Sequence, residues 1–195
     1  MKGAYVVSLV MIVSNARFRS EIIASLILAR NGEDRALHKW ESLMELQSRP
    51  LFTLYLELHP TIDIGPCPAG VRRIFPVSGG HFEGARLKGK VSPLIGSDLL
   101  VTRQDGTFQQ DVRVLLEADD GAHILMTYRG VRHASVEVSE RLGRGESVDP
   151  SEYYLRTTPY FETASPAYAW INAIVCVGKG GRFPGGVKYE LFEIL

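Results

Sequence analysis

From Ser48 to the end of the chain, apolar and polar residues alternate in short runs. Phe52, Leu54 and Leu56 occupy every second position of the first run, which predicts a strand with one face in a core. Glycine, proline and Asp-Gly pairs separate the runs, and nearly all the connections are too short to contain a crossover helix. The pattern therefore predicts an antiparallel sheet of eight or nine strands.

Closure of this sheet into a barrel is favoured by the number of strands, because a closed sheet has no exposed edges. Gly84 and Gly89 lie inside one predicted strand, and isolated glycines of this kind often mark the bulges and bends that a small barrel needs. We therefore predict an all-β fold in which residues 49–195 form a closed antiparallel barrel of eight to nine strands.

Some segments of the barrel region depart from simple alternation. Residues 132–152 are polar without a sustained period, which predicts a long surface loop with room for one helical turn. Pro66-Cys67-Pro68 predicts a shorter loop. Residues 170–177 predict an apolar strand, followed by a turn at the glycine-rich residues 178–181 and a last strand over residues 187–194.

Residues 1–48 have a different pattern. Apolar residues recur at helical spacing within residues 20–29 and again within residues 37–46, which predicts a short helical appendage before the barrel. The apolar run over residues 4–13, which small residues follow, leaves a cleaved signal peptide as an alternative.

Composition argues against two classes of partner. Basic and acidic residues number 22 each, and neither sign forms a long run, so we expect no binding to nucleic acid or to an anionic membrane. No apolar run approaches the roughly 20 residues that span a bilayer, which predicts a soluble, cytoplasmic protein. Cys67 and Cys176 are expected to be reduced and structural, with one bridge between them as the alternative.

The five histidines show no metal-binding spacing, so we predict no metal and no cofactor. His81, Glu83 and His123 are the least implausible ligands of a site assembled from separate strands. The glycines between residues 178 and 186 precede a predicted strand and not a helix, which argues against a phosphate-binding loop.

The densest chemistry lies between Tyr154 and Asn172. In an extended strand Tyr154, Arg156 and Glu162 face the same way, which makes one face polar and aromatic. Arg156 and Glu162 are about 20 Å apart along a straight strand, so they meet only if the chain bends at Pro159. Asn172 interrupts an apolar strand and needs a partner, because burying an unpaired amide costs about 1–3 kcal/mol.

Two further groups of polar residues have two interpretations each. Asp111 and Arg113 share one face of the strand that begins at Phe108, and this face is either a solvated exterior or a polar lumen that binds a ligand. Asp98 follows Gly96-Ser97, where it serves either a turn or a site.

Short pieces of sequence between residues 51 and 195 occur, in this order, in one family of proteins. The pieces are Ile64-Gly65, Gly70 to Arg73, Pro76 to Gly84, Gly89 to Val91, Gly96 to Asp98, Arg103 to Gly106, Asp111 to Arg113, Asp119 to Gly121, Tyr128 to Arg132 and Tyr154 to Asn172. Through them the chain resembles the uncharacterised bacterial and fungal proteins known as domain of unknown function 3237 and as UPF family 0311. This resemblance implies a lipocalin- or calycin-like antiparallel barrel with a central cavity, and it supplies no reaction.

The resemblance does not extend to residues 1–48, and members of the family begin shortly before the position of Pro50. Met44 is therefore a candidate start, and we expect much of residues 1–48 to be either an extension of the gene model or a poorly packed appendage. The family usually has an aromatic residue after the aspartate of the Gly-Ser-Asp piece, where this chain has Leu99.

A closed barrel with aromatic walls and a few convergent polar groups is a common small-molecule site. We therefore expect a cofactor-independent isomerase, cyclase or lyase that acts on a hydrophobic, polyketide-like molecule. Glu162 or Asp98 would move a proton, and Arg156 with Asn172 and Tyr168 would hold a carbonyl or developing enolate oxygen. The expected substrate-binding residues are Tyr128, Tyr154, Tyr168, Trp170, Asn172, Asp111 and Arg113.

Two alternatives to an enzyme stay open. A non-catalytic carrier would bind a similar ligand without turnover, whereas an interaction domain would have its lumen filled by side chains. The identity of the small-molecule ligand and the oligomeric state, with a homodimer among the options, do not follow from the sequence.

Overall fold

Nine strands account for most of residues 45–195, which are the residues that the structure, a computed structural model, describes. The helices predicted before residue 45, and the alternatives of a signal peptide or a start at Met44, lie outside these residues. The strands are β1 (Ser48–Leu58), β2 (Ile62–Cys67), β3 (Gly70–Glu83), β4 (Lys88–Thr102), β5 (Phe108–Ala118), β6 (His123–His133), β7 (Tyr154–Glu162), β8 (Cys176–Phe183) and β9 (Gly186–Ile194). The helices are α3 (Val136–Gly143) and two 3-10 segments, η1 (Pro150–Glu152) and η2 (Pro166–Ala173).

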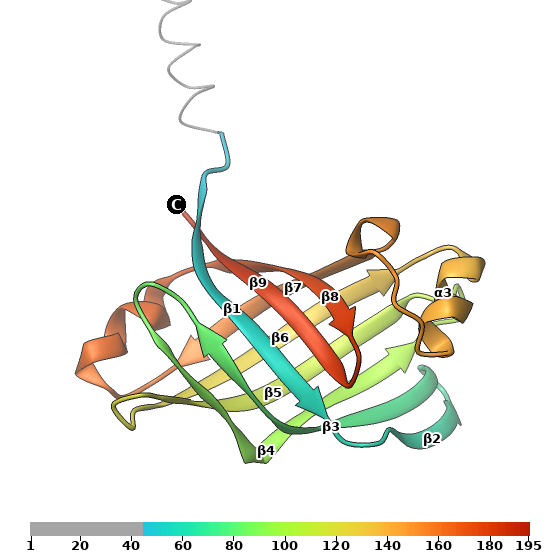
Figure 1. The fold of residues 1–195 in the computed structure, drawn as a ribbon, viewed down its shortest axis with the longest axis horizontal. Coiled ribbons are helices and arrows are strands. Elements are labelled where there is room, and N and C mark those ends of the chain that lie inside the picture. The colour runs from blue at the N-terminus through green and yellow to red at the C-terminus, as the bar shows by residue number, and fades with distance from the viewer. Residues whose placement is uncertain (1–44) are drawn as a thin grey trace, which may run out of the picture. The chain divides into compact units, whose positions relative to one another are not determined.

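Eight of these strands close into a barrel. The sheet order is β1-β9-β8-β7-β6-β5-β4-β3-β2, and β1 also pairs with β3, so the sheet closes and β2 remains as an extra strand on β3. Every pairing is antiparallel, and Figure 1 shows β1 running beside β9 at the closure. The predicted closed antiparallel barrel is therefore confirmed.

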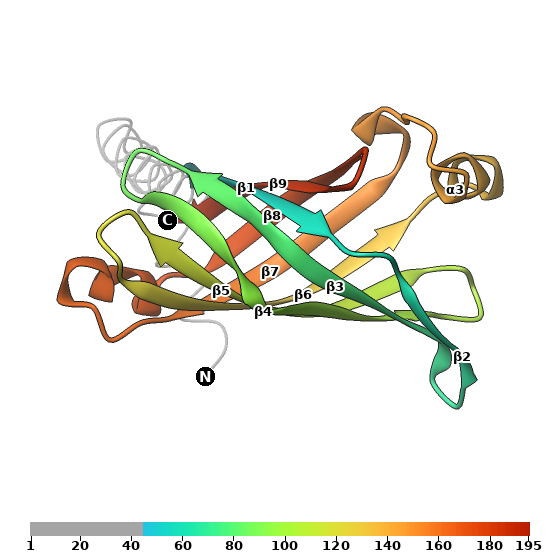
Figure 2. The ribbon, with the colours of Figure 1, turned by 60° about the horizontal axis from the view of Figure 1, so that its bottom comes forward.

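Short helices lie at the two ends of this barrel. Figures 1 and 2 both place α3 and the β2 hairpin at one end, which we call the α3 end, and η2 at the other, which we call the η2 end. The α3 helix is capped by the Ser135 hydroxyl, which accepts a hydrogen bond from the Val138 amide at 3.2 Å. No helix among residues 45–195 is long and apolar enough to cross a membrane.

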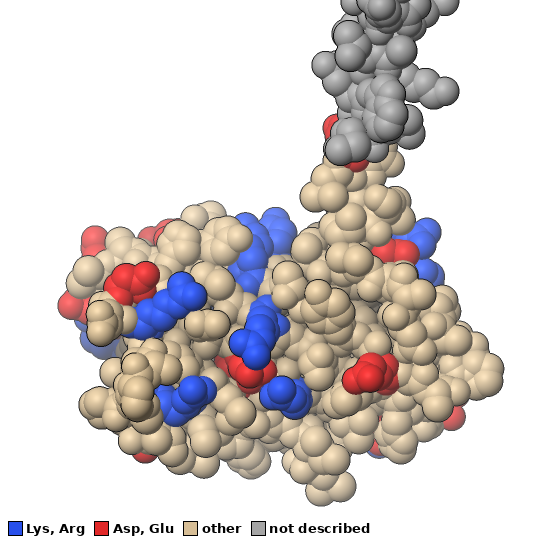
Figure 3. Space-filling view, turned by 180° about the vertical axis from the view of Figure 1, so that it is seen from behind, with Lys and Arg blue, Asp and Glu red and all other residues tan. Residues whose placement is uncertain are grey.

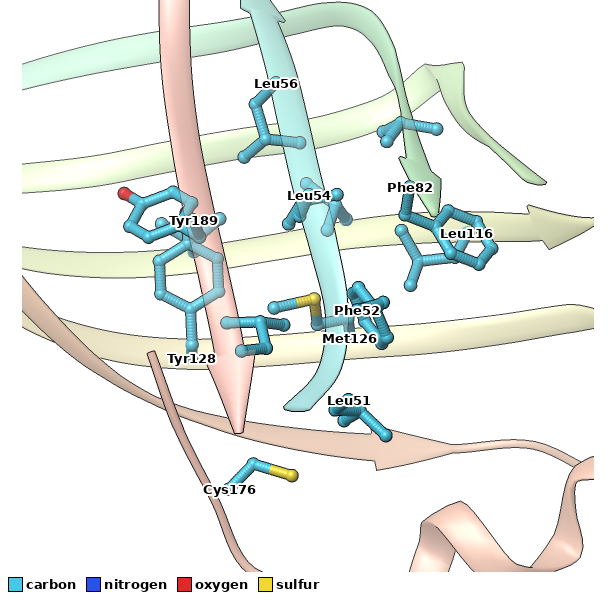
Figure 4. Close-up of a cluster of buried hydrophobic side chains, with 14 of the residues drawn as sticks. Leu51, Phe52, Leu54, Leu56, Phe82, Leu116, Met126, Tyr128, Cys176 and Tyr189 are labelled. Atoms are coloured by element: carbon cyan, nitrogen blue, oxygen red, sulfur yellow. The ribbon is translucent and has the colours of Figure 1, made fainter. Parts of the chain in front are cut away.

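The half of the lumen toward the η2 end is filled by apolar side chains. The Phe52 ring lies 5.3 Å from that of Phe82 and 5.8 Å from that of Phe161, and Ile124 and Met126 are fully buried. Figure 4 shows Phe52 and Phe82 on one side of this cluster, with Tyr128 and Tyr189 together on the other. The open part of the lumen therefore lies toward the α3 end.

The prediction for residues 170–181 was wrong. Residues 166–173 form η2, and β8 contains Gly178 and Gly180, neither of which has a positive φ. A Cβ atom would lie 2.3 Å from the Thr157 hydroxyl at Gly178 and 2.5 Å from the Leu155 side chain at Gly180. These glycines therefore allow the side chains of β7 to pack closely against β8, and the turn lies instead at Pro184-Gly185.

The predicted loops also differ from the structure. Residues 62–67 form β2, whose register shifts near Gly65, a glycine with φ of 88°. Within residues 132–152, β6 continues to His133, and α3 and η1 follow it. The periodicity did not reveal these helices because both are short: α3 buries only Val138 and Leu142, and η1 buries no residue.

Candidate functional site

A cavity of about 70 Å³ lies in the lumen, and its lining includes Arg132, near the end of β6 that leads to α3. All eight strands of the closed barrel contribute to it, and most of its wall is leucine, valine and aromatic side chain. The lining residues are Leu56, Leu58, Phe75, Val77, Asp98, Leu100, Phe108, Gln110, Val112, Tyr128, Arg132, Leu155, Arg182, Val187 and Tyr189. The lumen is thus an apolar pocket with a few polar groups, which is the usual form of a small-molecule site.

Four polar side chains from four strands meet in this cavity. Asp98 on β4 is 8% exposed and accepts hydrogen bonds from Gln110 Nε2 and from the Asp111 backbone amide, both at 3.1 Å. Gln110 Nε2 also donates to the Tyr189 hydroxyl at 2.9 Å, and the Tyr128 ring packs edge-on against that of Tyr189. The carboxyl group is therefore held in one orientation beside two phenols.

Burial sets the protonation of these groups. It raises the pKa of Asp98 to about 6, although the hydrogen bonds from Gln110 and the Asp111 amide oppose the shift. Burial also raises the pKa of Tyr189 to about 12 and that of Tyr128 well above its ordinary value. The phenols therefore stay neutral hydrogen-bond donors, while the carboxyl group exchanges its proton near neutral pH.

Two arginines line the same cavity. Arg132 is 7% exposed, and its guanidinium lies 3.7 Å from the centre of the Phe108 ring. Burial, together with the positive charge of Arg182, lowers the pKa of Arg132 to about 10, so the group stays charged at neutral pH. Arg182 on β8 is exposed and lies at the rim.

Asp98 and Tyr128 are the predicted site residues that line the cavity, whereas Asp111 and Arg113 lie outside it. Asp111 is within 3.2 Å of Arg113 and within 3.4 Å of Arg129 on the outer face of β5 and β6. The prediction that Asp111 and Arg113 bind substrate was wrong in placement, because Gln110 and its apolar neighbours fill the inner face. Figure 3 shows acidic and basic side chains interspersed over the outer surface in the same manner.

Replacing Asp111 with asparagine is expected to change the free energy of unfolding by less than about 1 kcal/mol, because exposed ion pairs contribute little. The hydrogen bond from the Asp111 amide to Asp98 comes from the backbone and survives the change. Urea unfolding at neutral pH measures the effect. A loss of several kcal/mol would show that Asp111 has a buried partner and would contradict this placement.

The predicted residues of β7 also face outward. Tyr154, Arg156 and Glu162 are exposed or half-buried, and the inner face is formed by the residues between them. The Arg156 guanidinium lies over the Tyr154 ring at 4.8 Å and donates to the Leu155 carbonyl at 2.9 Å. β7 pairs with β6 without interruption from Tyr154 to Glu162, so no bend at Pro159 brings Arg156 to Glu162. These three side chains therefore do not line the lumen cavity, and their part in ligand binding stays a prediction.

Three more predicted residues belong to η2. Asn172 is exposed and makes two 2.9 Å hydrogen bonds to the Thr163 backbone, so its partner is structural. The Trp170 ring lies 3.8 Å from the Arg86 guanidinium, and Tyr168 is half-buried. These side chains lie at the η2 end and do not line the lumen cavity, so their assignment to substrate binding stays a prediction.

The structure brings together residues that the sequence did not single out, chiefly Gln110, Tyr189, Arg132 and Arg182. A signal for Gln110 was present, because it is a polar residue in phase with the apolar face of its strand. Arg132 is likewise in phase with the buried residues of β6. Strand faces that are rich in polar residues lie on the exterior of the barrel. A single polar residue on an otherwise apolar face, such as Gln110, points into the lumen.

Cys67 and Cys176 are both free thiols, as predicted. Burial raises the pKa of Cys176 to about 12, so this thiol stays protonated and unreactive at neutral pH. His81 stacks on the Tyr55 ring at 4.5 Å. Within residues 45–195, no three His, Cys, Asp or Glu side chains are grouped so as to hold a metal ion.

Known structures share this barrel. A conserved protein of unknown function from Rhodopseudomonas palustris has 33% sequence identity and a TM-score of 0.74, with 77% of this chain and 98% of that chain covered. A β-barrel-like protein from Acinetobacter baumannii has 39% identity and a TM-score of 0.68, with 77% and 96% covered. A structure described as an enzyme from Penicillium herquei has 22% identity and a TM-score of 0.57, with 77% and 95% covered, and at that identity the likeness concerns the fold.

Proteins of similar sequence are also known. A UPF0311 protein of Rhodopseudomonas palustris is 33% identical over 150 residues, which are 77% of this chain and 97% of that protein. The family described as "Protein of unknown function (DUF3237)" matches residues 46–194. This match covers the whole barrel, from β1 to the end of β9. The chain therefore belongs to the DUF3237 family.

Proposed function

We propose that this barrel is a cofactor-independent enzyme of the isomerase, cyclase or lyase type, which acts on a hydrophobic, polyketide-like small molecule bound in the cavity. The observation that carries the proposal is the Asp98 carboxyl group, buried in an apolar pocket beside the hydroxyls of two buried tyrosines. With a pKa near 6, this group takes up and releases a proton close to neutral pH.

The chemistry suited to this arrangement is proton transfer next to a carbonyl group. Ionised Asp98 removes a proton from the carbon beside the carbonyl, and the electron pair of that C–H bond moves onto the oxygen. Tyr189 or Tyr128 donates a hydrogen bond to the resulting enolate oxygen. Gln110 Nε2 donates hydrogen bonds to both Asp98 and Tyr189, so the positions of the base and of the oxyanion donor are fixed relative to each other.

The fate of the enolate distinguishes the reaction types. Return of the proton from Asp98 to a different carbon gives an isomer. Attack of the enolate carbon on a second carbonyl closes a ring, and the resulting alkoxide oxygen takes the proton from Asp98. Expulsion of a group from the next carbon gives a lyase reaction, in which Asp98 supplies the proton that the leaving group takes. All three use the same carboxyl group, and none needs an oxidant or a reductant.

The residues to which we assign this chemistry differ from those expected from the sequence. Asp98 keeps its role, but Glu162 and Arg156 face outward and receive no part in the reaction. Tyr189 and Tyr128 take the role of oxyanion donors. The solved Penicillium herquei structure is described as an enzyme, which supports catalysis on this fold and leaves the reaction of this chain to experiment.

The test is an untargeted comparison by mass spectrometry. A metabolite extract from the organism that encodes the chain is incubated with the full-length protein, with Asp98→Asn, or with Glu162→Gln as a matched carboxylate control. We expect at least one hydrophobic metabolite to change in retention time at constant mass, or to lose a small group, with the protein and with Glu162→Gln but not with Asp98→Asn.

Two other outcomes would contradict the proposal. Retention of an unchanged metabolite by the protein, with no product in any sample, would indicate a carrier. A product formed equally by the Asp98→Asn variant would show that a different group moves the proton.

A further inference from the structure

Arg132 is a buried cation with no anionic partner in the described part of the chain. Its side chain makes no hydrogen bond there, and its Nε is buried and unpaired. Arg182 and Arg73, which are also positive, repel this charge, and the guanidinium lies over the face of the Phe108 ring. Among residues 45–195, no aspartate or glutamate carboxylate pairs with the Arg132 guanidinium.

Asp98 does not serve as that partner although it lines the same cavity. Its carboxyl oxygens accept their hydrogen bonds from Gln110 Nε2 and from the Asp111 backbone amide, and Asp98 forms no ion pair with Arg132 among the described residues. Arg132 is four residues beyond Tyr128 on the inner face of β6, a separation of about 13 Å along a strand. The cavity therefore has a carboxyl and two phenols toward its middle and two arginines toward the α3 end.

A buried, unpaired guanidinium is unfavourable unless something in the cavity completes its hydrogen bonds. The planar fork of an arginine matches the two oxygens of a carboxylate, and a second arginine nearby strengthens the attraction. The walls between Arg132 and Tyr128 are apolar and aromatic, so the rest of the bound molecule is hydrophobic.

We infer that the ligand of this cavity is a hydrophobic carboxylic acid, whose carboxylate is held by Arg132 and Arg182 while its body extends along the apolar wall toward Asp98 and Tyr189. This inference rests on the proposed function, because it assumes that the cavity is the substrate site. It narrows the substrate class to molecules that carry an acid at one end and the reacting carbonyl about 10 Å away, within the span set by β6.

The experiment compares two probes of the same shape by isothermal titration calorimetry. 2-Naphthoate carries the carboxylate, and 2-naphthamide is its neutral counterpart. We expect the full-length protein to bind the acid at least tenfold more tightly than the amide. Arg132→Gln, and separately Arg182→Gln, should reduce this preference to less than threefold.

Arg129→Gln is the matched control, because Arg129 lies on the same strand as Arg132 but on the outer face, where it pairs with Asp111. This variant should keep the full preference for the acid. Thermal unfolding separates binding from folding, and Arg132→Gln should be at least as stable as the parent because it removes an unpaired buried charge.

Equal affinity for acid and amide, or no binding of either, would overturn the inference. So would a loss of stability in Arg132→Gln with the preference for the acid intact, since Arg132 would then be a structural residue that packs on Phe108. Failure of the proposed function is distinguishable, because turnover that depends on Asp98 is measured in the extract and does not require that the ligand be an acid.

Discussion

Replacing Asp98 with asparagine is expected to stabilise the barrel by about 3 kcal/mol at neutral pH and to remove its activity. The pKa of Asp98 rises from 3.8 to about 6 on folding, and each pKa unit corresponds to about 1.4 kcal/mol. Asparagine has the shape of the neutral carboxyl group and never ionises, so the variant avoids the burial of a charge.

The stability that Asp98→Asn gains over the parent increases as the pH rises. The folded chain binds the Asp98 proton more tightly than the unfolded chain does, so the stability of the parent falls as the pH rises from about 4 to about 6. Above that range the whole cost is present, and below it parent and variant are alike. Urea unfolding of both proteins at pH 4 and at pH 7.5 measures the difference.

The hydrogen bonds in the cavity accommodate the change. Gln110 Oε1 is buried and has no partner among the described residues, whereas Gln110 Nε2 donates to both Asp98 and Tyr189. A rotation of this amide by half a turn presents Oε1 to the new asparagine amide and to the Tyr189 hydroxyl. The pocket therefore keeps its shape while the proton-transfer group is lost.

Asp105→Asn is the matched control for stability, because Asp105 is exposed and the amide of Thr107 lowers its pKa. That change should not stabilise the protein at any pH. In the extract assay, Asp98→Asn should lower turnover by about 10²- to 10⁴-fold, the usual contribution of a general acid–base group. A destabilised Asp98→Asn variant with full turnover would make Asp98 a structural residue.

Replacing Gly80 with alanine is expected to open the barrel at its closure. Gly80 pairs with Leu56 in the β1–β3 ladder and has φ of 134°, a conformation that residues with a Cβ rarely adopt. A Cβ atom there would lie 1.9 Å from the Tyr55 carbonyl oxygen, which belongs to the backbone of β1. Since neither strand can yield without breaking the ladder, we expect a loss of about 2–5 kcal/mol from strain and broken hydrogen bonds.

Gly143→Ala is the control for this change, because Gly143 ends α3, has no atom near its missing Cβ and does not have a positive φ. Alanine favours a helix by up to about 1 kcal/mol over glycine, so this variant should be as stable as the parent or slightly more so. Urea unfolding compares the three proteins. An unchanged Gly80→Ala variant would show that the β1–β3 pairing does not limit the stability of the barrel.

Much of the barrel was predictable because its strands alternate cleanly. Val112, Val114 and Leu116 mark one face of β5 as buried, and Asp119-Asp120-Gly121 forms the turn to β6. Alternation identifies which residues share a face and how many strands there are. These two facts are sufficient for an antiparallel sheet that closes.

The segment between β7 and β9 was less predictable, since glycine has more than one use. The glycines of β8 make room for the side chains of β7, yet in sequence they resemble a turn. Residues 166–173 have apolar residues on every side and resemble a buried strand, but the proline at the start and the bonds from Asn172 to Thr163 fix a 3-10 segment. In both segments, contacts with residues distant along the chain determine the secondary structure.

The site was only partly predictable, and the reason is physical. The exterior of a barrel is polar along every strand, so the concentration of charge in Tyr154–Glu162 and at Asp111 reflects solvation. Functional residues of a lumen are isolated polar groups on apolar faces, as Gln110 and Arg132 are. Asp98 was recognised through its neighbours in sequence. Tyr189, which binds the same Gln110 amide but is 91 residues away along the chain, was not.

The most direct test of the central claim is a ¹³C NMR titration of the Asp98 carboxyl carbon, assigned by its absence from the Asp98→Asn spectrum. Asp105 and Asp149, whose pKa values are lowered by backbone amides at exposed turns, provide reference signals in the same sample. We predict that Asp98 titrates near pH 6 while these references titrate below 3.8. A midpoint for Asp98 at or below 3.8 would show a solvated carboxylate and would contradict a proton-transfer site in the lumen.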